Sequence, residues 1–145
     1  MTRAGALDVL DSNLSSITIQ STTPSVYRGK PLAIAQSPCI GFWLESGTQT
    51  AITLANAGST TVWTIRVYFR LQLSGDMREQ VEEDVWQAMY DVSRVLLGDA
   101  TLGGNVDDLR VGGASAGYVE MSGGVFRTVT IPIEVDILND VTIAP

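Results

Sequence analysis

The stretch that most constrains the fold of this chain is Asp76 to Leu97, DMREQVEEDVWQAMYDVSRVLL. Its apolar residues recur at the three- and four-residue spacing of a helix with one buried face. They are Met77, Val81, Val85, Ala88, Val92 and the pair Val95 and Leu96. Asp76 and Glu79 have the spacing of a capping box, and Gly98 stands where a helix C-cap is expected. The sequence therefore predicts one amphipathic helix about 33 Å long, with Trp86 and Met89 widening its apolar stripe.

Two long segments alternate between apolar and polar residues, which indicates strands with one buried face. In the segment Thr60 to Leu73, the residues expected to face the core are Trp63, Ile65, Val67, Phe69, Leu71 and Leu73. In the segment Val125 to Leu138, they are Val125, Arg127, Val129, Ile131, Ile133, Val135 and Ile137. Pro132 lies inside the second segment. Because proline lacks a backbone N–H, it favours an edge strand or a bulge there.

Shorter segments supply the remaining expected elements. Residues 3–14 carry Ala6, Leu7, Leu10 and Leu14 at helical spacing, which predicts a short N-terminal helix. Further candidate strands are Cys39–Glu45, Thr50–Leu54, Val106–Val111 and Tyr118–Met121. Asn56–Ser59 is a turn signal, and Ser122–Gly124 is typical of a tight hairpin.

Residues 21–38 show no regular pattern, because Pro24, Pro31 and Pro38 interrupt them. A loop of this length in a compact domain is usually functional or docked on a neighbour. We therefore predict a single domain over residues 1–145 with an irregular, partner-facing segment at 21–38. The fold class is α+β, with a mostly antiparallel sheet of four to five strands. The long helix and the short N-terminal helix pack on one face, and a β-hairpin extends from the sheet.

The composition argues against several functions. The net charge of −7, with eight arginines and the single lysine Lys30, is too acidic for neutralising a DNA backbone. Histidine is absent, which removes the commonest general base and metal ligand. Cys39 is the only cysteine and is expected to be a small buried residue. No signal peptide and no run of about 18 apolar residues is visible, so we expect a soluble protein made in the cytoplasm.

No motif points to catalysis, to a cofactor or to a metal. The acids that could act as ligands in the first turns of the long helix are Glu79, Glu82, Glu83 and Asp84. The helix dipole accounts for acids at these positions, and no other ligand type converges on them. Glu134 and Asp136 lie on one face of their predicted strand and form an alternative carboxylate pair. GASAG at residues 113–117 lacks the histidine and the following helix of a nucleophile elbow.

The polar face of the segment Thr60 to Leu73 is a more specific candidate. It presents Arg66, Tyr68 and Arg70, which are either ordinary solvent-exposed residues or a contact with another subunit. Arginine and tyrosine are enriched in such contacts. The segments Val26–Pro38 and Gly112–Gly124 are the other candidate contact surfaces, since a hairpin can lend its edge to a neighbour.

From Val62 to Leu138 the chain resembles the tail terminator proteins of long-tailed bacteriophages, also called tail completion or minor tail protein U-like proteins. The resemblance is carried by TIRVYFRL, by the acidic-to-apolar helix that follows, and by VLLGDATLGGNVDDLRVGG, YVEMSGGVFR and TVTIPIEVDI. The N-terminal helix also fits the layout of that family. These motifs are structural, and related neck and tail proteins share the same general pattern.

The resemblance implies a structural virion protein without enzymatic activity, made in the host cytoplasm and located in the tail or neck. Such proteins form hexameric rings at the head-proximal end of the tail tube, stop its polymerisation, and join the tail to the head–tail connector. DNA passes through the lumen without specific binding, and no membrane is involved. Expected partners are further copies of the chain, the tail tube protein and the connector.

Two sets of residues follow from this interpretation. The expected subunit or partner interface comprises Arg28, Lys30, Arg66, Tyr68, Arg70, Gly113, Tyr118, Gly123, Gly124 and Arg127. The acids expected to line the lumen, where they would repel phosphates, are Glu79, Glu82, Glu83, Asp107 and Asp108. Three alternatives remain: a head-closure adaptor, a tail tube subunit, and a small ligand-binding or enzymatic α+β domain.

Overall fold

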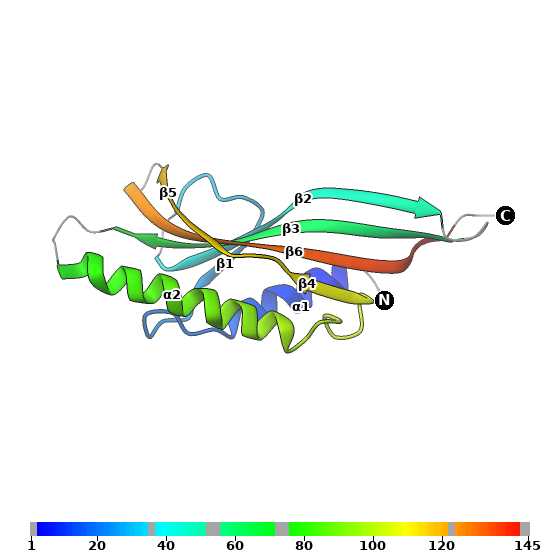
Figure 1. Cartoon of the computed structure of the whole chain (residues 1–145), viewed down its shortest axis with the longest axis horizontal. Coiled ribbons are helices and arrows are strands. Elements are labelled where there is room, and N and C mark those ends of the chain that lie inside the picture. The colour runs from blue at the N-terminus through cyan, green and yellow to red at the C-terminus, as the bar shows by residue number, and fades with distance from the viewer. Residues whose placement is uncertain (1–2, 35–36, 52–55, 72–75, 122–123, 143–145) are drawn as a thin grey trace.

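The computed structural model describes residues 3–34, 37–51, 56–71, 76–121 and 124–142. Its helices are α1 (Arg3–Ser15) and α2 (Asp76–Leu97). Its strands are β1 (Ser25–Arg28), β2 (Cys39–Ala51), β3 (Asn56–Arg70), β4 (Asp108–Val111), β5 (Ser115–Met121) and β6 (Gly124–Thr142). Both helices lie on the same face of one sheet, so the chain is an α+β protein (Figure 1).

The sheet has the strand order β1-β2-β3-β6-β4, and β5 pairs with β6 beyond the end of β4. All pairs are antiparallel except β1 with β2, so the sheet is mostly antiparallel, as the sequence predicts. The prediction of four to five strands is wrong, because the described residues form six. The missed strand β1 spans only four residues between Pro24 and Gly29, inside the segment expected to be irregular.

The predicted turn at Asn56–Ser59 is also wrong. These residues begin β3, and their ladder with β2 continues to the pair Ala51 and Ala57. Small polar residues on both strands, such as Thr48 opposite Thr60, pair there in spite of the turn-like composition. The hairpin turn predicted at residues 122–123 lies outside the described residues.

Pro132 is not on an edge strand, because β6 has β3 on one side and β4 and β5 on the other. Its carbonyl accepts the Gly112 N–H at 2.8 Å, so its missing N–H also faces the side of β4 and β5. β4 ends at Val111 and β5 begins at Ser115. Because proline cannot donate to a neighbouring strand, it coincides with the break between these two strands, where it removes no bond to β3.

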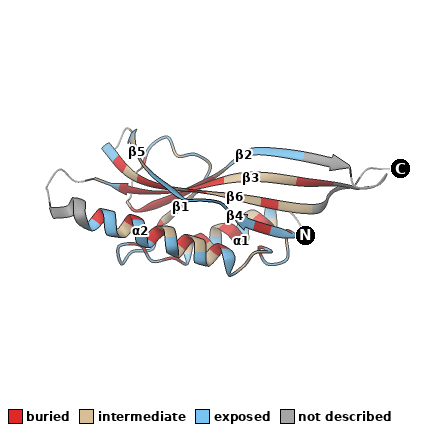
Figure 2. Cartoon of the chain, in the orientation of Figure 1, coloured by how far each residue is buried: buried red, intermediate tan, exposed pale blue. Residues whose placement is uncertain are grey.

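The main core lies between the sheet and the two helices, as the buried segments in Figure 2 show. The predicted core positions of β3 and β6 are confirmed from Ile65 to Phe69 and from Val129 to Val135. On α2, the buried residues are Val81, Val85, Ala88, Val92 and Leu96, which follow the predicted stripe. At the start of β6 the prediction fails, because Val125 is 43% exposed.

Candidate assembly surfaces

Several residues expected at an interface instead hold this chain together. Arg28 of β1 donates from Nη2 to Asp8 at 2.7 Å and from Nε to Asp11 at 3.0 Å, so it fastens α1 to the sheet edge. Lys30 and Arg66 both lie over the ring of Trp43, at 5.8 and 5.2 Å from its centroid. These three cationic side chains are therefore engaged within the chain.

Tyr68 was expected on a wettable face, and the structure corrects this. It is 1% exposed and packs with Ile34, Cys39 and Phe126 in a second cluster on the face opposite the helices. The covering segment is Gly29–Ile34, which we call the strap, and it arches over that face (Figure 1). Alternation along β3 could not reveal the strap, because the strap comes from a distant, pattern-free part of the chain.

The strap is anchored by specific contacts. Gly29 N–H donates to the Phe42 carbonyl at 2.7 Å, and Pro31 packs so closely on Gly41 that a Cβ there would lie 2.9 Å from its ring. Arg70 donates to the Ile34 carbonyl at 2.9 Å and lies 5.6 Å from the ring centroid of Phe126. Arg70, another expected interface residue, therefore holds the end of the strap against the sheet.

Beneath the strap, Cys39 is fully buried, which confirms the expectation for this cysteine. Burial raises the pKa of its thiol to about 12. The thiolate is the reactive form of cysteine, so this side chain is a packing residue in the folded protein.

Arg127 was expected at the interface and Glu82 in the lumen, yet the two side chains contact each other. Arg127 Nε donates to Glu82 Oε1 at 2.9 Å, and Nη2 donates to Oε2 at 3.2 Å. The guanidinium also donates to the Gly117 carbonyl and lies 4.5 Å from the ring centroid of Tyr118. This bidentate pair ties α2 to β6, while Tyr118 remains 64% exposed beside it.

The acids expected to line a lumen do not form one cluster. Glu83 is exposed on α2, Asp107 and Asp108 lie at the start of β4, and the side chain of Glu79 lies outside the described residues. Asp108 pairs with Asp136, whereas Glu82 contacts Arg127 nine residues away along the same strand. At about 3.3 Å per residue, roughly 30 Å separates the two groups.

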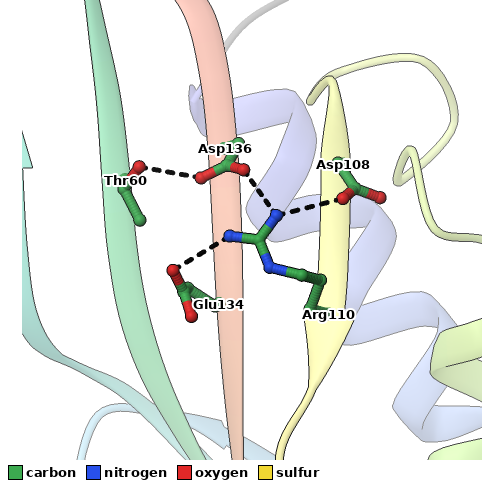
Figure 3. Close-up of polar contacts among 5 residues, drawn as sticks. All are labelled: Thr60, Asp108, Arg110, Glu134 and Asp136. Atoms are coloured by element: carbon green, nitrogen blue, oxygen red, sulfur yellow. Dashed lines mark hydrogen bonds and ion pairs between the residues drawn. The ribbon is translucent and has the colours of Figure 1, made fainter.

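Asp108 instead belongs to an ion-pair network on the face opposite the helices (Figure 3). Arg110 contacts Asp136 at 2.6 Å, Glu134 at 2.9 Å and Asp108 at 3.1 Å. Thr60 donates a further hydrogen bond to Asp136 at 2.8 Å. The hydrogen bond from Arg110 is the main reason that the pKa of Asp136 lies below its usual value. The alternative carboxylate pair, Glu134 and Asp136, is thus bridged by a guanidinium.

The remaining expected interface residues are glycines. Gly113 has open space where a side chain would project, and Gly124 has a φ of +122°. Gly123 lies outside the described residues. Among the described residues, no group of three His, Cys, Asp or Glu side chains is placed to hold a metal ion.

An exposed apolar surface on α2 was missed by the sequence analysis. Trp86, Tyr90 and Leu97 are 78%, 62% and 61% exposed, and we call them the α2 ridge. The prediction that Trp86 widens the buried stripe is wrong. The spacing of these three residues does indicate a separate side of the helix, because positions i, i+4 and i+11 lie on one side. That side differs from the one that carries Val81 and Val85.

A second apolar surface lies at the other side of the helix layer. A cavity of about 250 Å³, which we call the α1 cleft, opens between α1 and the sheet. It is lined by Leu7 and Leu10 of α1, by Leu44, Trp63 and Val135 of the strands, and by Leu102 and Val106 of the connection after α2, among others.

Comparisons with known proteins do not assign this chain to a group. No known protein family matches it, and no curated protein sequence matches it. In the part of the chain that the structure describes, neither helix has the length and apolar character needed to cross a membrane.

Proposed function

We propose that this chain is a tail terminator of a long-tailed bacteriophage or a related tail-like particle. In this proposal, copies of the chain form a ring, with six as the expected number. The ring caps the head-proximal end of the tail tube, stops tube polymerisation and docks on the head–tail connector, while DNA passes through the lumen. The protein is a virion component and catalyses no reaction.

The observation that supports this proposal most is the α2 ridge together with Tyr118. Four large apolar or aromatic side chains, each more than 60% exposed, stand on α2 and the adjacent edge strand β5. Large apolar side chains that are exposed in one region of a surface often mark sites of protein association. Aromatic side chains also dominate the energetics of interfaces.

The chemistry of the charged residues agrees with a structural role. Arg28, Arg110 and Arg127 each bind carboxylates of the same chain. These pairs connect α1 to β1, β4 to β6, and α2 to β6. Among the described residues, the exposed apolar side chains outside these pairs include the ridge, Leu32 and Leu44.

The finer features of the fold belong to the same proposal. We propose that β5 and β6 form an extended hairpin that lends the free edge of β5 to a neighbouring copy or to the tail tube. Strands can associate through such an edge by main-chain hydrogen bonds, while alternate side chains provide specificity.

The test is the mass of the purified chain by light scattering, followed by its addition to growing tail tubes made from tube subunits of the same genome. We expect a closed ring and tubes of arrested length. Long tubes formed by the chain alone would identify a tube subunit instead. Rings that leave tube growth unchanged and bind only the connector would identify a head-closure adaptor.

A further inference from the structure

The outward side of α2 carries two aromatic rings and a carboxylate close together. Trp86 and Tyr90 are one turn apart, and Glu83 precedes Trp86 by three residues. Residues at this spacing share one side of a helix, and all three are exposed, so that side is turned away from the sheet. Together with Gln87 they line a shallow hollow, which we call the α2 hollow. A partner reaches it from the helix side of the molecule.

The carboxylate of Glu83 is not neutralised by the part of the chain that the structure describes. No described arginine or lysine lines the α2 hollow, and none forms an ion pair with Glu83. Arg94 contacts the Tyr90 ring, 5.8 Å from its centroid, but it comes from the next turn toward the C-terminus, whereas the hollow lies toward the N-terminus. The α2 hollow thus combines two aromatic rings with a negative charge that is open to solvent.

The neighbouring residue on the same helix shows what such a combination binds. Glu82 accepts two hydrogen bonds from the Arg127 guanidinium, at 2.9 and 3.2 Å, and that guanidinium also lies 4.5 Å from the centroid of the Tyr118 ring. One cation is therefore held by a carboxylate and an aromatic ring together. A guanidinium suits both, because it pairs with carboxylates through two parallel hydrogen bonds and stacks on aromatic faces. The α2 hollow offers the same two kinds of group to a cation from outside the chain.

This chain is a poor source of that cation. Its net charge is −7. Every arginine or lysine whose side chain the structure describes already contacts a carboxylate, an aromatic ring or a carbonyl of the same chain. These residues are Arg28, Lys30, Arg66, Arg70, Arg94, Arg110 and Arg127. Pairing between copies through these residues would give up such contacts, whereas a different protein with a basic surface is complementary in charge to the hollow.

We propose that the α2 hollow binds an arginine from a basic segment of another protein. The guanidinium lies against the Trp86 and Tyr90 rings and pairs with Glu83. This inference rests on the proposed function, because it gives the chemistry of the tube or connector surface that meets the ring. Glu83 was expected in the lumen, and in this inference it faces the partner instead.

The test measures the binding of short synthetic peptides to the full chain, followed by the backbone amide NMR signals of α2. The probe is a glycine–serine peptide that carries two arginines, and the matched peptides carry two lysines or two glutamines at the same positions. The arginine peptide binds most tightly and the lysine peptide more weakly, because arginine makes the better contact with aromatic rings. An arginine peptide that binds no better than the glutamine peptide would overturn the inference.

Two variants of the hollow test its parts separately. Glu83→Gln weakens binding of the arginine peptide about threefold, as expected for an exposed ion pair. Trp86→Leu weakens it about fivefold through the lost cation–π contact. Both residues are exposed, so both variants keep the folded state. Glu45→Gln is the matched control, because Glu45 accepts hydrogen bonds from Trp43 and Thr64 on the opposite face of the sheet, and it leaves the affinity unchanged.

Two outcomes would assign the hollow differently. Equal weakening by Glu83→Gln and Glu45→Gln would mean that the peptide responds only to net charge, and would overturn the inference. Self-association of the chain that Trp86→Leu abolishes, measured by light scattering without peptide, would give the hollow to a second copy and overturn it too.

The tube assay separates the failure of this inference from the failure of the proposed function. A chain that arrests tail tubes but does not bind the arginine peptide rejects the arginine site and keeps the tail terminator function. A chain that binds the peptide through Glu83 and Trp86 but does not arrest tubes keeps the site and rejects that function.

Discussion

The two faces of the sheet are both buried near Tyr68, but by different means. On one face, two helices cover a large core that includes Ile65, Val67 and Phe69. On the other face, Ile34 of the strap packs on a small cluster of Cys39, Tyr68 and Phe126. The helices are regular elements with their own backbone hydrogen bonds. The strap is a short irregular segment that is held by a few contacts.

The difference shows what each kind of cover requires from the sequence. The helix-side core depends on apolar residues that recur with the periods of a helix and a strand. The strap cluster depends on single residues, because Ile34 alone reaches down from the strap into the cluster. We expect the helix-side core to unfold only with the whole protein, and the strap to open locally.

The largest expected effect comes from truncating one phenylalanine on each face. Phe69 and Phe126 are both fully buried, on the helix side and under the strap respectively. Phe69→Ala is expected to lower the free energy of unfolding by about 4–5 kcal/mol, and Phe126→Ala by nearer 3 kcal/mol, because the strap can settle into the cavity. Urea unfolding measures both. Equal losses would mean that the strap is as rigid a cover as the helices.

A second prediction uses Cys39 as a probe of the strap. With a thiol pKa of about 12, Cys39 in the folded protein reacts at pH 8 on the order of 10³-fold more slowly than a free thiol. Ile34→Ala is expected to cost about 2 kcal/mol and to accelerate labelling about 30-fold by easing local opening. Leu32→Ala, a change on the same strap at an exposed position, leaves the rate unchanged. Unchanged labelling in Ile34→Ala would show that the strap does not gate this thiol.

The third prediction concerns the same face of the sheet at the break between β4 and β5. A Cβ at Gly112 would lie 2.8 Å from Pro132 Cγ and 3.3 Å from its carbonyl oxygen. Gly112→Ala is therefore expected to destabilise the protein by about 1–3 kcal/mol through overpacking. Gly113→Ala, which meets open space, changes stability by less than about 0.5 kcal/mol. Thermal melts of both variants test this, and similar melting temperatures would contradict it.

The smallest effect is expected at the Arg110 network, which is open to solvent on this face (Figure 3). Arg110→Gln leaves three neighbouring carboxylates without their counter-charge, which raises the pKa of Asp136 and lowers stability at pH 7. In the wild type the pKa of Asp136 is depressed, so its stabilising contribution is present above about pH 4 and is lost as the pH falls through the depressed value. The two melting curves should converge on acidification. A difference that persists at pH 2 would assign the effect to lost packing.

The sequence predicted the elements whose pattern is internal to a segment. The period of α2 and the alternation of β3 and β6 placed Val85, Ile65 and Ile131 in the core, where the structure has them. The strap, strand β1 and the break at Pro132 could not be predicted in this way. Each depends on which distant segment lies alongside, and no local pattern records that.

The residues expected at an interface show the same dependence on distant parts of the chain. Charged residues such as Arg28, Arg66 and Arg127 were expected at an interface because arginine is enriched in such contacts. Their partners within the chain are distant in sequence, so the sequence did not reveal them. The α2 ridge was missed for the opposite reason. Trp86 is apolar and was assigned to the buried stripe, although its spacing places it with Tyr90 and Leu97 on another side of α2, where it is exposed.

The contact between Lys30 and Trp43 has a practical consequence. Lys30 is the only lysine of the chain, so the one side chain that an amine-reactive dye modifies, besides the terminal α-amino group, lies on the strap and 5.8 Å from an indole ring. Contact quenching of Trp43, one of the three tryptophans of the chain, would then be lost when the strap opens. The single lysine and the indole beneath it thus allow strap opening to be followed by fluorescence.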